Sequence, residues 1–315
     1  TSSRNAHRTE ISNCAFITGY ERDNESELDF AQNRYYNSGH GRFTTTDPLL
    51  TSGRLVDPQS WNRYAYVLNS PLRYVDPLGL YEWDASLGGS ATDEELKKRK
   101  GGQKILDRRN DIRNAMTDAA DQAAKGALSG RITSAESGAI FDSLAAYGSE
   151  GEANGVTLAY GKVENGAAAE TRYMTDASGK VTPFSTDANG KVTAHIVVTF
   201  GEGQKITANT VAHEGSHTAD RQNLGRAFER ALQGSDVNLH PSNLAENITK
   251  YATELRAYRV SSYLDQATNT PSQVWNQGWK AVDRDKAINS LLKSNKLYKL
   301  TPEKPGIQIY TEKPK

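Results

Sequence analysis

Two histidines four residues apart, with a glutamate directly after the first, form the pattern in this chain that is best suited to chemistry. The segment reads His213-Glu214-Gly215-Ser216-His217. On a helix, side chains four residues apart lie on one face about one turn apart, so both imidazoles can bind one tetrahedral ion. Zinc in such a site lowers the pKa of its bound water toward about 7, and Glu214 can act as general base. The pattern predicts a zinc-dependent peptidase; two surface histidines on a solvated helix are the alternative.

A catalytic zinc ion needs a third protein ligand, and the sequence offers three candidates. Asp220 lies three residues past His217, but a continuous helix would carry it away from the ion. His240 lies in a predicted loop, where its reach is unconstrained. Glu254 lies in the helical pattern of residues 245–267, and a glutamate supplied by a second, downstream helix resembles the arrangement of gluzincin peptidases. We favour Glu254 as the ligand and Asp220 as a carboxylate that orients a histidine.

Tyr258 is a further candidate for the same site. It lies four residues after Glu254 and therefore on the same face of the predicted helix. Its hydroxyl could donate a hydrogen bond to the oxyanion of a tetrahedral intermediate. Packing in a helix interface is the alternative role. Arg256 and Arg259 on the same helix are weaker catalytic candidates.

Hydrophobic spacing predicts the helices that must position these side chains. Apolar residues at helical spacing predict a helix over 104–128. A second helix over 133–147 starts with Thr133 and Glu136, the two residues of a capping box. Helical spacing returns after residue 203 and continues to about residue 295.

Alternating apolar and polar residues predict four strands between these helices. The strands cover 156–160, 170–174, 181–184 and 192–200, with hairpin turns at 176–179 and 187–190 and a last strand-like run at 307–310. Helices, a small antiparallel sheet and further helices predict an α+β domain. Strand 192–200, directly before the histidine helix, resembles the zincin-type peptidases, in which an edge strand holds the substrate peptide by backbone pairing.

Composition excludes several other classes. The 315-residue chain has 38 Lys and Arg against 38 Asp and Glu, so no net charge favours nucleic acid or an anionic membrane as partner. One cysteine, Cys14, excludes an internal disulfide framework. No apolar run has the length of a membrane span, and the N-terminus has no apolar segment of a Sec signal. The missing initiator methionine suggests a fragment of a longer protein.

The first 80 residues differ from the rest, because they are dense in Tyr, Arg, Asn, Gly and Asp-Pro pairs. They predict short β-strands joined by tight turns, as part of a larger β assembly. The characteristic motifs, in order, are Gly19-Tyr20-Glu21-Arg22-Asp23, Asn33-Arg34-Tyr35-Tyr36-Asn37, Gly41-Arg42-Phe43, Asp47-Pro48, Asn62-Arg63-Tyr64-Ala65-Tyr66, Asn69-Ser70-Pro71 and Asp76-Pro77-Leu78-Gly79-Leu80. This succession resembles the RHS repeat-associated core domain.

The resemblance implies a chemistry of its own for this segment. The RHS core ends a hollow β-shell of YD repeats and acts as an aspartic autoprotease that cuts after the Asp-Pro-x-Gly-Leu sequence, here the bond Leu80–Tyr81. Asp47 and Asp76 match the autoproteolytic aspartates of that family, and Arg34 matches its associated arginine. Two carboxylates that share a proton can activate water against a peptide bond. A turn-forming role for the Asp-Pro pairs is the alternative, above all for Asp57, and Arg34 could equally be a structural cation.

Together these patterns predict three segments: an RHS core over 1–80, a polar linker over 81–104 and a zinc metallopeptidase effector over 105–315. The resemblance implies a toxin cargo, secreted or injected into a target cell by a bacterial delivery system. Its expected partners are its own RHS shell, a protein substrate in the target cell and an immunity protein. A non-enzymatic binding or membrane-acting toxin with an incidental histidine pair is the alternative.

Overall fold

The computed structural model describes residues 21–23, 28–31, 34–37, 42–44, 80–150, 154–233, 248–295, 299–306 and 309. The chain divides into two compact units, Thr1–Leu78 and Gly79–Lys315. In the first unit, a four-stranded antiparallel sheet has the order β1-β2-β3-β4. Its strands are β1 (Glu21–Asp23), β2 (Leu28–Ala31), β3 (Arg34–Asn37) and β4 (Arg42–Phe43). These are the short strands expected for this segment.

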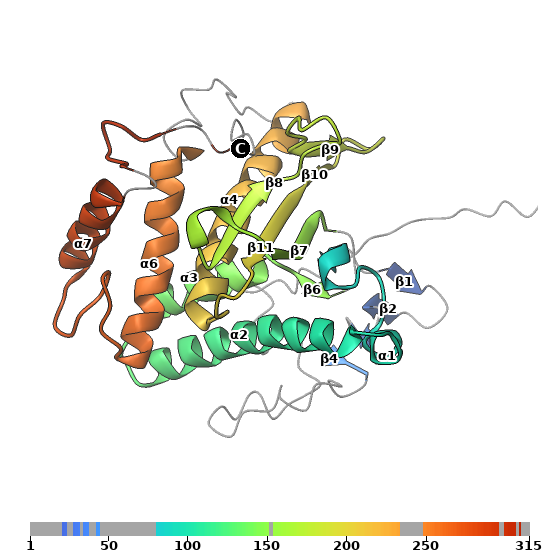
Figure 1. Cartoon of the computed structure of the whole chain (residues 1–315), viewed down its shortest axis with the longest axis horizontal. Coiled ribbons are helices and arrows are strands. Elements are labelled where there is room, and N and C mark those ends of the chain that lie inside the picture. The colour runs from blue at the N-terminus through green and yellow to red at the C-terminus, as the bar shows by residue number, and fades with distance from the viewer. Residues whose placement is uncertain are drawn as a thin grey trace, which may run out of the picture. The chain divides into compact units, whose positions relative to one another are not determined.

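The second unit combines helices with a mixed sheet (Figure 1). Its described α-helices are α1 (Asp93–Lys98), α2 (Gly102–Leu128), α3 (Ser134–Ala145), α4 (Ala208–Leu232), α6 (Lys250–Thr268) and α7 (Ala281–Ser294). Short 3-10 helices are η4 (Ala85–Leu87) and η5 (Glu164–Gly166). The capping box of α3 is present, with the Glu136 carboxylate accepting from the Thr133 N–H at 2.8 Å. None of the described helices combines the length and apolar composition that crossing a membrane requires.

The sheet of the second unit has the order β6-β5-β7-β11-β8. Its strands are β5 (Leu80–Trp83), β6 (Ser149–Glu150), β7 (Val156–Gly161), β8 (Ala169–Tyr173) and β11 (Ile196–Gly201). Neighbours pair in parallel except β11 and β8, so the expected antiparallel sheet is wrong. Parallel pairing joins strands that are distant in sequence, which local alternation cannot reveal.

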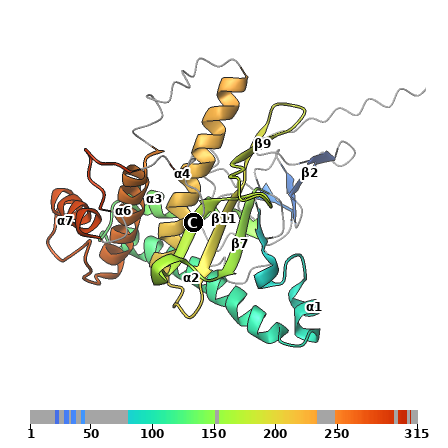
Figure 2. The same ribbon diagram turned by 45° about the horizontal axis from the view of Figure 1, so that its top comes forward.

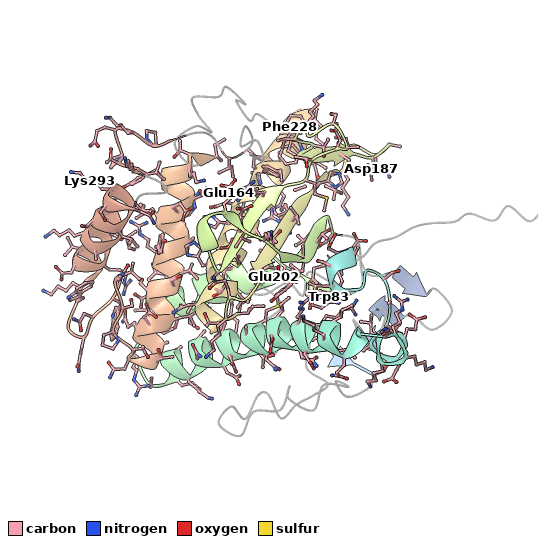
Figure 3. The ribbon with its side chains drawn as sticks, in the orientation of Figure 1. Trp83, Glu164, Asp187, Glu202, Phe228 and Lys293 are labelled. Carbon is pink, nitrogen blue, oxygen red and sulfur yellow. The ribbon has the colours of Figure 1, made fainter. Side chains whose placement is uncertain are left out.

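A short hairpin arm leaves the sheet between β8 and β11. It consists of β9 (Phe184–Thr186) and β10 (Val192–Ala194), which pair antiparallel. The predicted strand 192–200 is therefore broken at His195, where the chain leaves the arm and enters the sheet. The Phe184 ring stacks on Phe228 of α4 at 5.7 Å between centroids, and Figure 3 shows Phe228 beside this arm. Both predicted turns are present, with Gly179 and Gly190 at positive φ.

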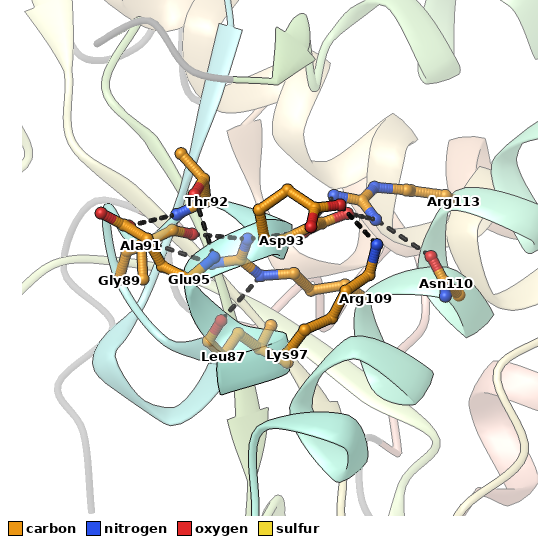
Figure 4. A network of polar contacts seen from close by, with 11 residues as sticks. Leu87, Gly89, Ala91, Thr92, Asp93, Glu95, Lys97, Arg109, Asn110 and Arg113 are labelled. Atoms are coloured by element: carbon orange, nitrogen blue, oxygen red, sulfur yellow. Dashed lines mark hydrogen bonds and ion pairs between the residues drawn. The ribbon is translucent and has the colours of Figure 1, made fainter. Parts of the chain in front are cut away.

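Residues 81–104 are not a linker. They form β5, η4, α1 and the start of α2, and Trp83 and Leu87 belong to the main hydrophobic core. Arg109 of α2 is 1% exposed and donates to the carbonyl oxygens of Leu87, Ala91 and Gly89 at 2.8, 2.9 and 2.8 Å (Figure 4). Because the buried guanidinium satisfies these carbonyls, the polar, glycine-rich segment is held against α2.

Helix α4 is the central helix of the second unit. It contacts α2, α3 and α6 on its sides and β8, β10 and β11 of the sheet and arm, as Figure 2 also shows. Its residues 214–218 are all buried, and small side chains there let the neighbouring elements approach closely. The histidine pair therefore lies inside the unit, on a helix held by packing on several sides.

Candidate metal centre

Helix α4 carries both histidines on the face that meets α6. Its start follows Thr207, whose hydroxyl oxygen accepts from the Thr210 N–H at 3.2 Å. The ring centroids of His213 and His217 are 5.0 Å apart in an edge-to-face arrangement. His217 is buried and His213 is half-buried, so the solvated surface helix weighed as an alternative is wrong.

Gly215, between the two histidines, marks the closest approach of α4 to α3. A Cβ atom at this position would lie 2.2 Å from the carbonyl oxygen of Ser143 and 2.8 Å from its carbonyl carbon. Real Cβ contacts are not this short, so only glycine fits without moving one backbone. The residue type in the middle of the motif is thus set by helix packing.

Glu254 of α6 completes a cluster with the two histidines. Its Oε2 atom lies 3.6 Å from Nε2 of His213 and 3.6 Å from Nε2 of His217. One ligand atom from each of the three residues lies within 4.8 Å of the others. Ligands of a tetrahedral zinc ion with bonds of about 2.1 Å are about 3.4 Å apart, and the two distances from Glu254 to the histidines are close to this spacing.

The Glu254 carboxylate has an unusual environment for a structural residue. Its side chain is 6% exposed, and Oε2 is buried without a hydrogen-bond partner among the described residues. A buried carboxylate oxygen in that state costs free energy unless a cation is near it. Two neutral imidazoles and one carboxylate are a donor set that suits zinc, so these residues fit the ion.

Electrostatics at the cluster also favour a cation. Burial alone would raise the pKa of the Glu254 carboxyl, but His217 and His213 outweigh burial and lower that pKa well below its usual range. Burial lowers the pKa of His217, yet the Glu254 carboxylate shifts it upward overall. Glu254 is therefore an anion in the fold. Metal and protons compete for the histidine nitrogens, since ligand nitrogens must be deprotonated.

Glu214 is not one of the three residues of the cluster, and its carboxylate is bound by strand β8. It is 6% exposed, and its Oε2 accepts a hydrogen bond from the Thr171 hydroxyl at 2.7 Å. The sequence did not indicate Thr171, because its contact with Glu214 joins residues of a strand and a helix 43 positions apart.

The predicted edge strand is a different strand. Strand β11, which precedes α4, lies between β7 and β8, whereas β8 is last in the sheet order. Chain order alone does not determine which strand forms the edge of a sheet, because that depends on long-range pairing. Strand β8, and not the predicted strand 192–200, is therefore the edge strand beside β11.

Asp220, the alternative ligand, is not part of the cluster. Its Oδ1 accepts from Nε of Arg256 at 2.8 Å, so it is joined to α6 one turn beyond the histidines. Its other oxygen, Oδ2, is buried without a partner among the described residues. Burial raises the pKa of Asp220, and Arg256 and His217 partly oppose that shift.

Of the other residues predicted on α6, Tyr258 lies beside the histidines and Arg259 does not. The Tyr258 ring contacts His213 edge-to-face at 4.7 Å between centroids, so this tyrosine lies beside the cluster. Burial, together with Glu254 and Glu214, raises its pKa above the ordinary value. Arg259 binds both carboxylate oxygens of Asp285 on α7 at 2.8 Å each, away from the histidines.

Ser261 is a neighbour of the cluster that sequence reasoning missed. Its hydroxyl lies 3.3 Å from Nδ1 of His213, the nitrogen that does not face Glu254. A hydrogen bond at that nitrogen sets the tautomer that leaves Nε2 free for a metal. The signal for it was weak but present, since Ser261 lies seven residues after Glu254, two turns along one face of a helix.

The expected autoproteolytic residues lie mostly outside the described residues. Asp47 and Asp76 lie there, as does His240, the candidate zinc ligand. Arg34 starts β3, opposite Ala31 of β2. Leu80 and Tyr81 lie in β5, paired with Ser149 and Glu150 of β6.

No protein-family model and no solved structure matches the chain. It is 32% identical over 106 residues to the uncharacterized protein YlbH of Escherichia coli (strain K12), covering 34% of this chain and 41% of that protein. It is 34% identical over 85 residues to the tRNA(Glu)-specific nuclease WapA of Bacillus subtilis subsp. natto (strain BEST195), covering 27% of this chain and 4% of WapA. A third relative, the uncharacterized protein YibJ of Escherichia coli (strain K12), is 39% identical over 66 residues, 21% of this chain and 25% of its own length. The chain therefore spans less than half the length of each of these relatives.

Proposed function

We propose that the second unit is a zinc-dependent endopeptidase. His213, His217 and Glu254 are its zinc ligands, and Glu214 is its general base. The observation that carries the proposal is the buried Oε2 of Glu254, which is equidistant from the two Nε2 atoms and accepts no hydrogen bond from any residue that the structure describes. Zinc, when bound, supplies a Lewis acid and a water of lowered pKa.

The protein's own groups then provide the positioning. Glu214 keeps one carboxylate oxygen bound by Thr171, and no described residue donates to Oε1, which can accept a proton. Tyr258 remains a protonated hydroxyl, because its pKa is raised, and can donate to a developing oxyanion. The open side of β8 offers backbone groups to an extended substrate peptide, which would add as a further strand.

Metal analysis of the purified full chain tests this proposal. We expect close to one equivalent of zinc per chain, and a loss of affinity of at least about tenfold in Glu254→Ala, because one of three ligands is removed. Asp220→Asn is the matched control: it should keep its zinc, since Asp220 binds Arg256 and lies outside the cluster. Less than a tenth of an equivalent in the wild type would refute the metal centre, and zinc loss in Asp220→Asn alone would reassign the third ligand.

The same proposal includes release from a shell. We infer that Asp47 and Asp76, with Arg34, cut the chain at Leu80–Tyr81 and free an effector that acts on a protein in a target cell. The sequence resemblance to the RHS core supports this role, which also implies an RHS shell and an immunity protein as partners. Because Leu80 and Tyr81 are paired with β6 in the folded unit, the bond must be cut before β5 joins the sheet, or while β5 is detached.

Autoproteolysis is tested separately on a denaturing gel. The wild-type chain should run as two fragments, whereas Asp47→Asn should run as one band near 34.5 kDa, because asparagine cannot share a proton with Asp76. Asp57→Asn is the control, since its Asp-Pro pair is interpreted as a turn. Continued cleavage in Asp47→Asn would refute the assignment, as would an uncut Asp57→Asn chain.

RNA cleavage is a second candidate function, favoured by the local similarity to the protein named as a tRNA(Glu)-specific nuclease. The equal numbers of basic and acidic residues give it no electrostatic support. Incubating the full chain with tRNA separates the two candidates. Cleavage of tRNA that survives Glu214→Gln, with an unfolded protein left intact, would favour the nuclease. A binding or membrane-acting toxin predicts neither activity.

A further inference from the structure

Thr171 of strand β8 contacts the carboxylate of Glu214, the proposed general base. Along β8, the side chains of Ala169, Thr171 and Tyr173 are buried, and those of Glu170 and Arg172 are half-buried on the other face. Thr171 is 6% exposed and lies 2.7 Å from Oε2 of Glu214. A strand residue in the sheet thus makes the direct hydrogen bond to the carboxylate of the proposed base.

The direction of that hydrogen bond follows from the neighbouring groups. Thr171 Oγ1 also lies 3.3 Å from the backbone carbonyl oxygen of Glu214, but that carbonyl accepts a shorter bond, 2.9 Å, from the Thr218 hydroxyl. An ionised carboxylate is the stronger acceptor, and bonds of 2.7 Å are typical of O–H donors on carboxylates. The Thr171 hydroxyl therefore donates its hydrogen bond to Oε2 of Glu214.

The backbone of Thr171 faces the open side of the sheet. Met174 N–H donates to the His195 carbonyl, and Gly201 N–H donates to the Ala168 carbonyl. In residues 168–174, the backbone groups of the even-numbered residues therefore face β11. In an antiparallel pair the residues between them point their N–H and C=O groups the other way. Thr171 therefore presents its backbone to the edge where a substrate strand would pair, while its side chain holds the base.

We propose that Thr171 is the residue that positions the general base, and that it links substrate docking on β8 to the orientation of Glu214. This inference rests on the proposed peptidase function. Its hydroxyl holds Oε2 and so restrains rotation of the carboxylate, which leaves Oε1 for proton transfer. A substrate strand that pairs with the Thr171 backbone is thereby placed in register with the base.

Replacing the hydroxyl by a methyl group of similar size tests this role. In the full chain, Thr171→Val should lower kcat by about 10- to 100-fold, the usual effect of removing a partner that orients an active-site ligand. KM and zinc content should stay close to wild type, because no ligand and no backbone group is changed. Thr171→Ser keeps the hydroxyl and should restore kcat to within about threefold. Thr199→Val on the neighbouring strand β11, which is half-buried and paired with Glu170 of β8, is the control for the substitution itself.

A crystal structure of Thr171→Val provides a readout that does not depend on activity. The Glu214 carboxylate should leave its position near β8 or adopt more than one rotamer. If Thr171→Val does not fold, kcat and the Glu214 position are compared between Thr171→Ala, which lacks the hydroxyl, and Thr171→Ser, which keeps it. A variant without the hydroxyl that keeps wild-type kcat and the Glu214 position overturns the inference while the peptidase stands. A wild-type chain that binds no zinc and cleaves no protein overturns the peptidase, and this inference with it.

Discussion

Replacing Glu214 by glutamine is expected to reduce proteolysis by the full chain at least about a thousandfold, because general-base catalysis contributes up to about 10⁴-fold and an amide cannot accept the proton. Glutamine retains the size of the side chain and an oxygen for the Thr171 hydroxyl, which lies 2.7 Å from Oε2. The fold should therefore change little. Glu214 also lies outside the ligand cluster of His213, His217 and Glu254, so zinc content should remain at the wild-type level.

Cleavage of an unfolded protein such as casein, followed with time, measures this loss. Glu229→Gln is a matched control on the same helix, since Glu229 accepts from the Val192 N–H at 2.7 Å in the hairpin arm and has no part in the cluster. It should keep activity within about twofold, as expected for a residue remote from the reacting groups. Retention of a tenth or more of the activity in zinc-loaded Glu214→Gln would exclude Glu214 as the base.

The second large effect is expected from a single methyl group at Gly215. Gly215→Ala places a Cβ 2.2 Å from the Ser143 carbonyl oxygen and 3.0 Å from the Tyr147 ring, so α3 and α4 must move apart. Overpacking of this kind costs about 1–3 kcal/mol, and here the obstacle is backbone, which places the cost at the upper end. Because the histidines lie on either side of Gly215, zinc affinity should fall as well.

Denaturant unfolding of the full chain measures this change as a lower midpoint. The control is Gly138→Ala on α3, where a Cβ meets nothing within 4 Å. There the greater helix propensity of alanine should leave stability unchanged or raise it by up to about 1 kcal/mol. An unchanged midpoint and zinc affinity in Gly215→Ala would contradict the close approach of the two helices.

Local patterns predicted the local structure well. The capping box of α3, the two predicted turns at 176–179 and 187–190 and most helices and strands are present, because hydrogen bonds and spacing over a few residues define them. The segment 81–104 shows the opposite case. Its glycines and charges suggested a linker, but Gly88 and Gly101 form turns at positive φ, and Arg109 binds its carbonyls from a helix further along the chain.

The histidine pair and its glutamate were determined by the sequence, because the pitch of a helix places residues four apart on one face whatever surrounds it. Which of the two carboxylates, Glu254 or Asp220, lies beside the histidines depends on the crossing of α4 and α6, since both have the right chemistry for a ligand. The parallel sheet, the edge at β8 and the Thr171–Glu214 hydrogen bond were likewise decided by the tertiary structure. These features depend on contacts between residues far apart in the chain, and local periodicity does not contain that information.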